Sequence, residues 1–136
     1  MDVLSEEMVK AAIQGDTQRI RVLLEQGADV NYKAWSDRTA LQEAAARGHT
    51  DSLKLLLDHG ADIEAVNTEG QTALIRASIY SKRECLQLLL ARGANVRAKD
   101  KFKRNALDYA FLYNRTAAAE MLMAAMGRDT ELVPVK

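Results

Sequence analysis

A period of thirty-three residues runs through most of this chain and constrains its fold more than any other feature. The segments GADVN, GADIE and GANVR stand at that spacing, at Gly27, Gly60 and Gly93. The same step relates TAL at Thr39 to TAL at Thr72, and it relates the apolar runs RVLL, KLLL, QLLL and EMLM to one another. Four copies are therefore visible. A strict period of this length indicates a solenoid, in which each unit packs only on its neighbours.

The second copy, TALQEAAARGHTDSLKLLLDHGADIE, predicts two helices joined by a short turn. Thr39 is suited to cap the first helix, the alanine-rich run after it favours helix, and Gly48 supplies a left-handed residue to end it. A second helix is expected from Thr50 to about His59, because its leucines fall on one face. The unit is therefore a pair of antiparallel helices.

Small residues and turn residues indicate how the copies stack. Ala44 and Ala45 on the first helix let the next copy approach closely, so that the apolar faces of successive copies bury one another. After Gly60 the chain is expected to run extended, and NTEG from Asn67 is a turn signal that returns it to the next helix. Each helix pair is thus followed by a projecting finger.

These motifs resemble the ankyrin repeat, whose pattern runs roughly D-x-x-G-x-T-P-L-H-x-A-A-x-x-G-H, then an apolar helix and L-L-x-x-G-A-D-V-N. The resemblance covers about residues 4 to 126. It implies an all-α ankyrin-repeat solenoid of four stacked helix-turn-helix units with short β-hairpin-like fingers, and no other domain. We place an N-terminal capping repeat at residues 1–33, two full repeats at 34–66 and 67–99, a C-terminal capping repeat at 100–126 and a flexible tail at 127–136.

The chain departs from the family pattern at positions that link neighbouring units. Where the family has His, this chain has Gln42, Ile75 and Asp108, so we expect the polar network that the histidine joins in the family to be weakened. Ser81 and Asn114 replace the glycine that ends the first helix of the third and fourth units, and serine tolerates a left-handed φ poorly. We therefore predict that the last two units open before the first two.

Composition bounds the class of protein. Nineteen Lys plus Arg balance nineteen Asp plus Glu, so no overall charge draws the chain to nucleic acid or to a membrane. No apolar run approaches the roughly 20 residues that cross a bilayer, and the first residues do not resemble a secretory signal. We expect a cytoplasmic or nuclear protein that does not enter membranes and is a monomer by itself.

No cluster of residues suggests catalysis, a metal or a cofactor. His49 lies in the GH turn and is interpreted as a structural cap, and its spacing from His59 does not suit two ligands on one helical face. Cys85 is expected to be a partly buried, inert thiol, although Lys82 and Arg83 leave a reactive thiol open. The glycine spacings match no phosphate-binding loop. We expect no enzyme activity and no cofactor.

In the family that this chain resembles, the fingers and the exposed face of the first helices form one concave surface that binds partner proteins. The resemblance carries this role onto the matching positions. These are Lys33, Trp35, Ser36, Arg38, Arg47, Thr68, Glu69, Gln71, Ile79, Tyr80, Lys99, Lys101, Phe102, Arg104 and Tyr113, with Val66 and Leu112 beside them. Aromatic residues recur among them, and such residues often dominate interface energetics. The alternatives are that Trp35 and Phe102 only pack on neighbouring finger tips, and that Tyr80 and Tyr113 stack on each other.

The stretch RGANVRAKDKFKR, residues 92–104, holds six basic side chains and one acid, Asp100. Nonspecific nucleic-acid binding needs a wide basic face, and this one ends at Glu69, so we favour an acidic segment of a protein partner. Lys101 and Arg104 would steer that segment toward the aromatic anchors. The chain is interpreted as a stoichiometric inhibitor or adaptor, and the alternative is a scaffold or assembly factor within a larger complex.

Overall fold

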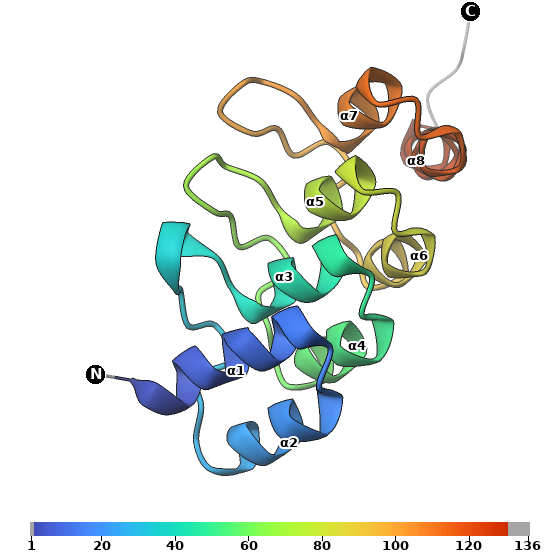
Figure 1. Ribbon diagram of the computed structural model, residues 1–136. Coiled ribbons are helices and arrows are strands. Elements are labelled where there is room, and N and C mark those ends of the chain that lie inside the picture. Colours follow the sequence, from blue (N-terminus) through green and yellow to red (C-terminus); the bar gives the residue numbers. More distant parts are fainter. Residues whose placement is uncertain (1, 131–136) are drawn as a thin grey trace, which may run out of the picture.

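The computed structural model describes residues 2–130, which form helices stacked in pairs (Figure 1). Within those residues the helices are α1 (Val3–Gln14), α2 (Thr17–Glu25), α3 (Ala40–Arg47), α4 (Thr50–Asp58), α5 (Ala73–Ile79), α6 (Arg83–Ala91), α7 (Ala106–Leu112) and α8 (Thr116–Thr130), with a short 3-10 helix, η1 (Trp35–Asp37). The predicted all-α stack of four helix-turn-helix units is confirmed.

The helices form two rows. The first helices of the pairs, α1, α3, α5 and α7, pack on one another in chain order, and the second helices, α2, α4, α6 and α8, do the same. Figure 1 shows the fingers projecting on the left of the view, from the row of first helices. The first helices therefore share a side of the molecule with the fingers.

Side-chain caps fix where the first helices begin. The Thr39 hydroxyl accepts a hydrogen bond from the backbone N–H of Gln42 at 3.3 Å, and the Gln42 side chain accepts one from the Thr39 N–H at 3.1 Å. Asn105 and Asp108 form the same reciprocal pair at the start of α7. The predicted cap at Thr39 is confirmed, and a cap of this kind stabilises a helix by about 1 kcal/mol.

The core repeats with the period of the sequence. Leu56, Leu89 and Leu122 occupy one position in three successive second helices, and each is fully buried. Ala44 is also fully buried, and its small side chain lets α3 approach both α1 and α5, as predicted. Burying a leucine side chain stabilises the fold by about 1.5–3 kcal/mol. Because neighbouring units supply part of that burial, the units stabilise one another.

Gln42 also links neighbouring units, so the expectation of a weakened polar network is wrong at this position. Its Nε2 donates to the Ala65 carbonyl oxygen at 2.8 Å, at the base of the next finger, and its side chain is fully buried. Glutamine fills both roles because its amide carries an acceptor, used in the cap, and a donor. At the equivalent position of α5, Ile75 has no polar side-chain atom with which to make such a link.

Two side chains that follow a first helix bond to the preceding unit. His49 Nε2 lies 3.1 Å from the Ile13 carbonyl oxygen, and Arg115 Nε donates to the Ile79 carbonyl oxygen at 2.9 Å. His49 makes no capping bond to its own helix α4, so its structural role differs from the predicted cap. Both bonds satisfy carbonyl groups near the end of a helix, where intrahelical partners run out.

Left-handed residues follow the first helices. Gly48 has a φ of 79°, as predicted, and Ser81 and Asn114 have φ values of 55° and 58° at the same repeat position. This conformation costs a residue with a Cβ roughly 1–2 kcal/mol, and asparagine adopts it more readily than serine. The strain at Ser81 therefore lies in the turn between α5 and α6.

The last helix is longer than the preceding ones. α8 continues through Gly127 to Thr130, so the tail predicted at residues 127–136 begins inside a helix. Residues 131–136 of that predicted tail lie outside the described residues. The predicted unit boundaries after residues 33, 66 and 99 fall in the loops between helix pairs.

Candidate protein-binding surface

Each finger is closed by a backbone hydrogen bond between the same two repeat positions. These bonds run from Ala34 N to Arg38 O at 2.8 Å, from Asn67 N to Gln71 O at 3.1 Å, and from Asp100 N to Arg104 O at 3.0 Å. The fingers are therefore hairpin-like in closure, although no regular strand is assigned in residues 2–130.

Neighbouring fingers are joined tip to tip. The Thr68 N–H donates to the Ser36 carbonyl oxygen at 3.0 Å, and the Lys101 N–H donates to the Glu69 carbonyl oxygen at 3.0 Å. Gly70 has a φ of 78°, and a Cβ there would come within 3.0 Å of the Lys101 nitrogen, so this contact needs glycine. The fingers are thus held in register. The term finger surface is used here for residues 33–38, 66–71 and 99–104, together with Arg47, Ile79, Tyr80 and Tyr113.

Asp100, the acid of the basic stretch, is buried and shapes the third finger from inside. Its Oδ1 accepts from the backbone N–H groups of Phe102 at 2.9 Å and Arg104 at 3.1 Å, and its Oδ2 accepts from the Tyr109 hydroxyl. Burial and the bond to Asp100 raise the pKa of Tyr109. Because the carboxylate points inward, the exposed Lys101 and its basic neighbours dominate the outside of this finger.

Aromatic side chains expose about half of their area on the finger surface. The exposed fractions are 46% for Trp35, 48% for Tyr80, 54% for Phe102 and 47% for Tyr113. About half of the Trp35 and Phe102 side chains is covered within the protein, which leaves room for packing on neighbouring finger tips, and the other half is open to a partner.

Tyr80 and Tyr113 have separate neighbours, so the alternative in which they stack on each other is wrong. The ring of Tyr113 stacks on Tyr109, with centroids 6.2 Å apart and planes at 8°. The guanidinium carbon of Arg76 lies 6.0 Å from the centroid of the Tyr80 ring.

The remaining predicted residues differ in how far a partner can reach them. The exposed ones are Lys33, Ser36, Arg47, Thr68, Glu69, Lys99, Lys101 and Arg104. Arg38 and Ile79 are half-buried. Gln71 is buried, and its Oε1 accepts from Asn67 Nδ2 at 3.1 Å, so it belongs to the frame of the second finger.

A buried carboxylate surrounded by three arginines lies beside the finger surface. Glu43 is fully buried, and its carboxylate lies 3.3 Å from Arg76 Nη2, 3.4 Å from Arg47 Nε and 3.7 Å from Arg38 Nε. These four residues are called the arginine cluster. Sequence reasoning places Arg38 and Arg47 here but misses Glu43 and Arg76. The missed pair stands thirty-three residues apart at one repeat position, and that signal could have found it.

The repeat pattern also has a counterpart among known protein families. The family model described as ankyrin repeats (many copies) matches residues 8–57 and residues 41–90, which together cover more than half of the chain. The chain belongs to the ankyrin-repeat family. Among curated proteins, no match to the sequence was found. Ankyrin repeats are generally protein–protein interaction modules and are typically non-catalytic.

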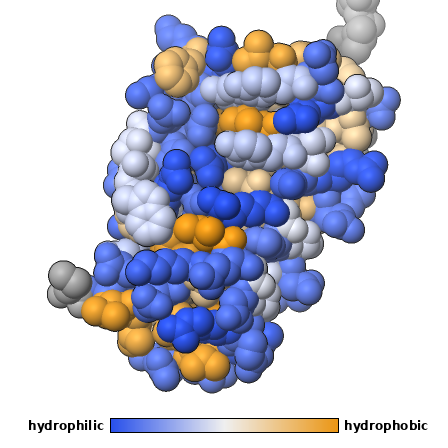
Figure 2. Space-filling view, in the orientation of Figure 1, coloured by the Kyte–Doolittle hydropathy of each residue, from blue (hydrophilic) through white to orange (hydrophobic). Residues whose placement is uncertain are grey.

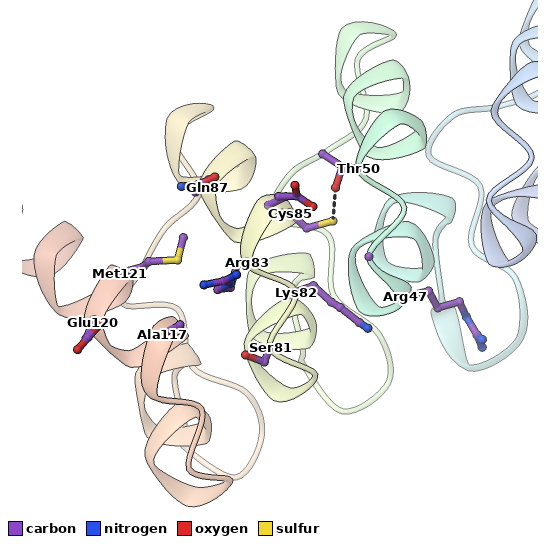
Figure 3. A pocket seen from close by; sticks show the side chains of 12 residues that line it. Arg47, Thr50, Ser81, Lys82, Arg83, Cys85, Gln87, Ala117, Glu120 and Met121 are labelled. Atoms are coloured by element: carbon purple, nitrogen blue, oxygen red, sulfur yellow. Dashed lines mark hydrogen bonds between the residues drawn. The ribbon is translucent and has the colours of Figure 1, made fainter.

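The cysteine of these ankyrin repeats is shielded. Cys85 on α6 is fully buried, more so than predicted, and its Sγ lies 3.5 Å from Thr50 Oγ1 (Figure 3). Burial raises the pKa of the Cys85 thiol, and the hydrogen bond with Thr50 opposes this shift more than the charge of Lys82 does. A protonated, buried thiol is a poor nucleophile. Within residues 2–130, no three His, Cys, Asp or Glu side chains gather closely enough to hold a metal ion.

An open groove of about 760 Å³ passes Cys85 on another side of the ankyrin stack (Figure 3). Lys82, Arg83 and Glu84 from α6 and its preceding turn line the groove, and Glu120 on α8 faces it from the last unit. Its lining carries both basic and acidic side chains, and the Cys85 thiol beside it is buried and has a raised pKa.

The exterior of the ankyrin stack is mostly polar on the side that Figure 2 shows. Hydrophilic and intermediate side chains cover most of this view, and the hydrophobic ones form separate spots. None of the helices in the described part of the chain combines the length and the apolar character needed to cross a membrane.

Proposed function

We propose that this ankyrin-repeat chain binds a partner protein along the finger surface and acts as a stoichiometric inhibitor or adaptor. The proposal rests on the exposure of Trp35, Tyr80, Phe102 and Tyr113 beside fingers that are held in register. Exposed aromatic side chains on a rigid frame make strong anchors, because little conformational entropy is lost when they are buried. Blocking or bridging a partner requires binding alone.

The charge of the finger surface suggests an acidic binding segment in that partner. Its predicted positions include six basic residues, Lys33, Arg38, Arg47, Lys99, Lys101 and Arg104. Among the acids of the three fingers, Asp37 and Glu69 are exposed, and the carboxylate of Asp100 is buried inside its finger. Complementary charge raises the association rate and orients the partner, whereas the aromatic side chains supply most of the affinity.

Affinity capture from the native extract tests this proposal. The bait is the full chain, compared with a Trp35→Ala, Tyr80→Ala, Phe102→Ala triple variant. A matched control carries Val22→Ala, Glu25→Ala and Gln87→Ala, which alter exposed side chains on α2 and α6. We expect at least one protein to be captured by the wild type and the control but lost with the triple variant. Identical captures with all three baits would contradict the proposal.

A scaffold within a larger complex is the second candidate, favoured by apolar side chains exposed on the last unit. Phe111 and Met123 expose 57% and 45% of their areas and line one hollow. Such side chains would provide a second contact region apart from the finger surface of the first units. The mass of the captured complex separates the two candidates. One partner at a 1:1 ratio supports an inhibitor or adaptor, and several partners bound at once support a scaffold.

A further inference from the structure

A hollow of about 460 Å³ lies beside the arginine cluster, at the ends of α3 and α5. It is lined by Ala46, Arg47, Arg76, Tyr80 and Lys82. Three of these five side chains are cationic and none is acidic. The aromatic ring of Tyr80 is half-exposed at its edge.

The arginine cluster holds more positive charge than its acid neutralises. Arg38, Arg47 and Arg76 share the single carboxylate of Glu43, so three guanidinium groups and one carboxylate leave a net charge of +2. Lys82, which lines the same hollow, adds a further positive charge. A low-dielectric site with surplus charge attracts a counter-ion more strongly than the same charges would in water.

Donor groups in the cluster are also unused. Arg76 has only 8% of its area exposed, and neither its Nε nor the Nε of Arg38 has a hydrogen-bond partner in the described part of the chain. Buried guanidinium N–H groups are normally hydrogen-bonded. Arg76 lines the hollow, so an acceptor that enters the hollow would lie against a guanidinium side chain whose hydrogen-bonding capacity is only partly used.

We propose that this hollow binds a carboxylate side chain, from aspartate or glutamate, in the acidic segment of the partner protein. Of the cationic residues that line the hollow, Arg47 is exposed, Lys82 is half-buried and Arg76 is buried. Guanidinium groups suit a planar carboxylate, and these arginines already hold the carboxylate of Glu43. The inference deepens the proposed function and rests on it, since it names the chemistry of one contact on that surface.

A titration followed by nuclear magnetic resonance tests this site in the full chain. The probes are hexaglutamate, hexaglutamine as the uncharged control, and a phosphoserine-containing peptide of the same length. We expect hexaglutamate to shift the Nε–H signal of Arg76 and the backbone signals of Arg47, Tyr80 and Lys82 in a saturable way. Hexaglutamine should leave these signals in place, and added salt should weaken the binding of hexaglutamate.

Two double variants sharpen the test. Arg47→Gln with Lys82→Gln removes two of the cationic charges that line the hollow, and we expect about tenfold weaker hexaglutamate binding. Lys82 is the N-cap residue of α6, but its side chain makes no capping hydrogen bond, so the helix start keeps its bonds. Arg21→Gln with Lys54→Gln removes the same charge from exposed positions on α2 and α4, and we expect less than about a twofold change there.

Several outcomes would overturn the assignment. If hexaglutamate shifts only the signals of the third finger, the hollow is not the binding site. The same holds if both double variants weaken the affinity for hexaglutamate equally. If the phosphoserine peptide binds more tightly than hexaglutamate, the hollow is a site for phosphate groups and not for carboxylates. None of these results would contradict the proposed function, which the affinity capture with the aromatic variants decides separately.

Discussion

At the scale of single residues, buried polar side chains connect neighbouring units of the stack by hydrogen bonds. Gln42 joins the start of α3 to the base of the next finger through two side-chain bonds. We predict that Gln42→Met lowers the free energy of unfolding by about 1–3 kcal/mol, because the Thr39 N–H and the Ala65 carbonyl lose their partners. Methionine keeps most of the side-chain volume, so a cavity contributes little. Urea unfolding followed by circular dichroism measures the change.

The family residue provides the control for this prediction. Gln42→His restores a side chain with both a donor and an acceptor, and we expect it to keep more of the stability than Gln42→Met. If the methionine variant unfolds at the wild-type urea concentration, the two bonds contribute nothing measurable. The polar link would then have no energetic role.

Cys85 is expected to make the folded protein less stable at alkaline pH. Burial raises the pKa of its thiol in the folded state, whereas in the unfolded chain the thiol ionises near its ordinary pKa of roughly 8.5. Above that pH the unfolded chain has released a proton that the folded protein still holds, so the free energy of unfolding falls as the pH rises. We predict a larger fall between pH 7 and 9.5 for the wild type than for Cys85→Ala. Urea unfolding at both pH values measures it, and equal falls would contradict the prediction.

At the scale of elements, the four units differ in how firmly they are held. The third and fourth units carry Ser81 and Asn114 in left-handed conformations, and Ile75 gives the third unit no polar link like that of Gln42. We predict faster amide hydrogen exchange in α5 to α8 than in α1 to α4, because local opening needs less free energy there. Hydrogen exchange resolved by residue measures this, and uniform protection along the stack would contradict it.

Ser81→Gly is the matched variant for this gradient. Glycine removes the steric cost of the left-handed conformation but adds flexibility to the unfolded chain, so we expect a net gain of about 0.5–1 kcal/mol. Protection should rise in α5 and α6 and change little in α1. A rise of equal size in all helices would show that the stack opens as one unit.

The helices and their buried faces were largely predictable from the sequence, because the period identifies equivalent residues in successive units. Leu56 and Leu89 fall on the apolar face of their helices, and Thr39 and Gly48 mark the limits of one helix by local chemistry alone. Glu43 was missed because a charged residue in the middle of a helix is usually solvated, and its burial depends on arginines from other segments. The inward position of Asp100 likewise depends on a tyrosine in the following helix.

At the scale of the whole molecule, charge is balanced in total but uneven in its placement. The chain has nineteen basic and nineteen acidic residues, yet the third finger exposes Lys99, Lys101 and Lys103 around an inward-facing Asp100. At 0.1 M salt the field of an exposed charge extends only about 10 Å. A partner would therefore sense this local basic region during approach, even though the molecule as a whole is neutral.

Reversal of charge on this finger tests whether the region guides association. We predict that Lys101→Glu with Arg104→Glu slows association with the captured partner by about tenfold at low salt and flattens the dependence of the rate on salt. Dissociation should change less, because exposed charges at an interface act mainly on the association rate. Arg21→Glu with Lys54→Glu on α2 and α4 makes the same change in net charge away from the fingers. Surface plasmon resonance at several salt concentrations measures both pairs, and equal slowing by both would mean that overall charge, rather than the basic finger, sets the rate.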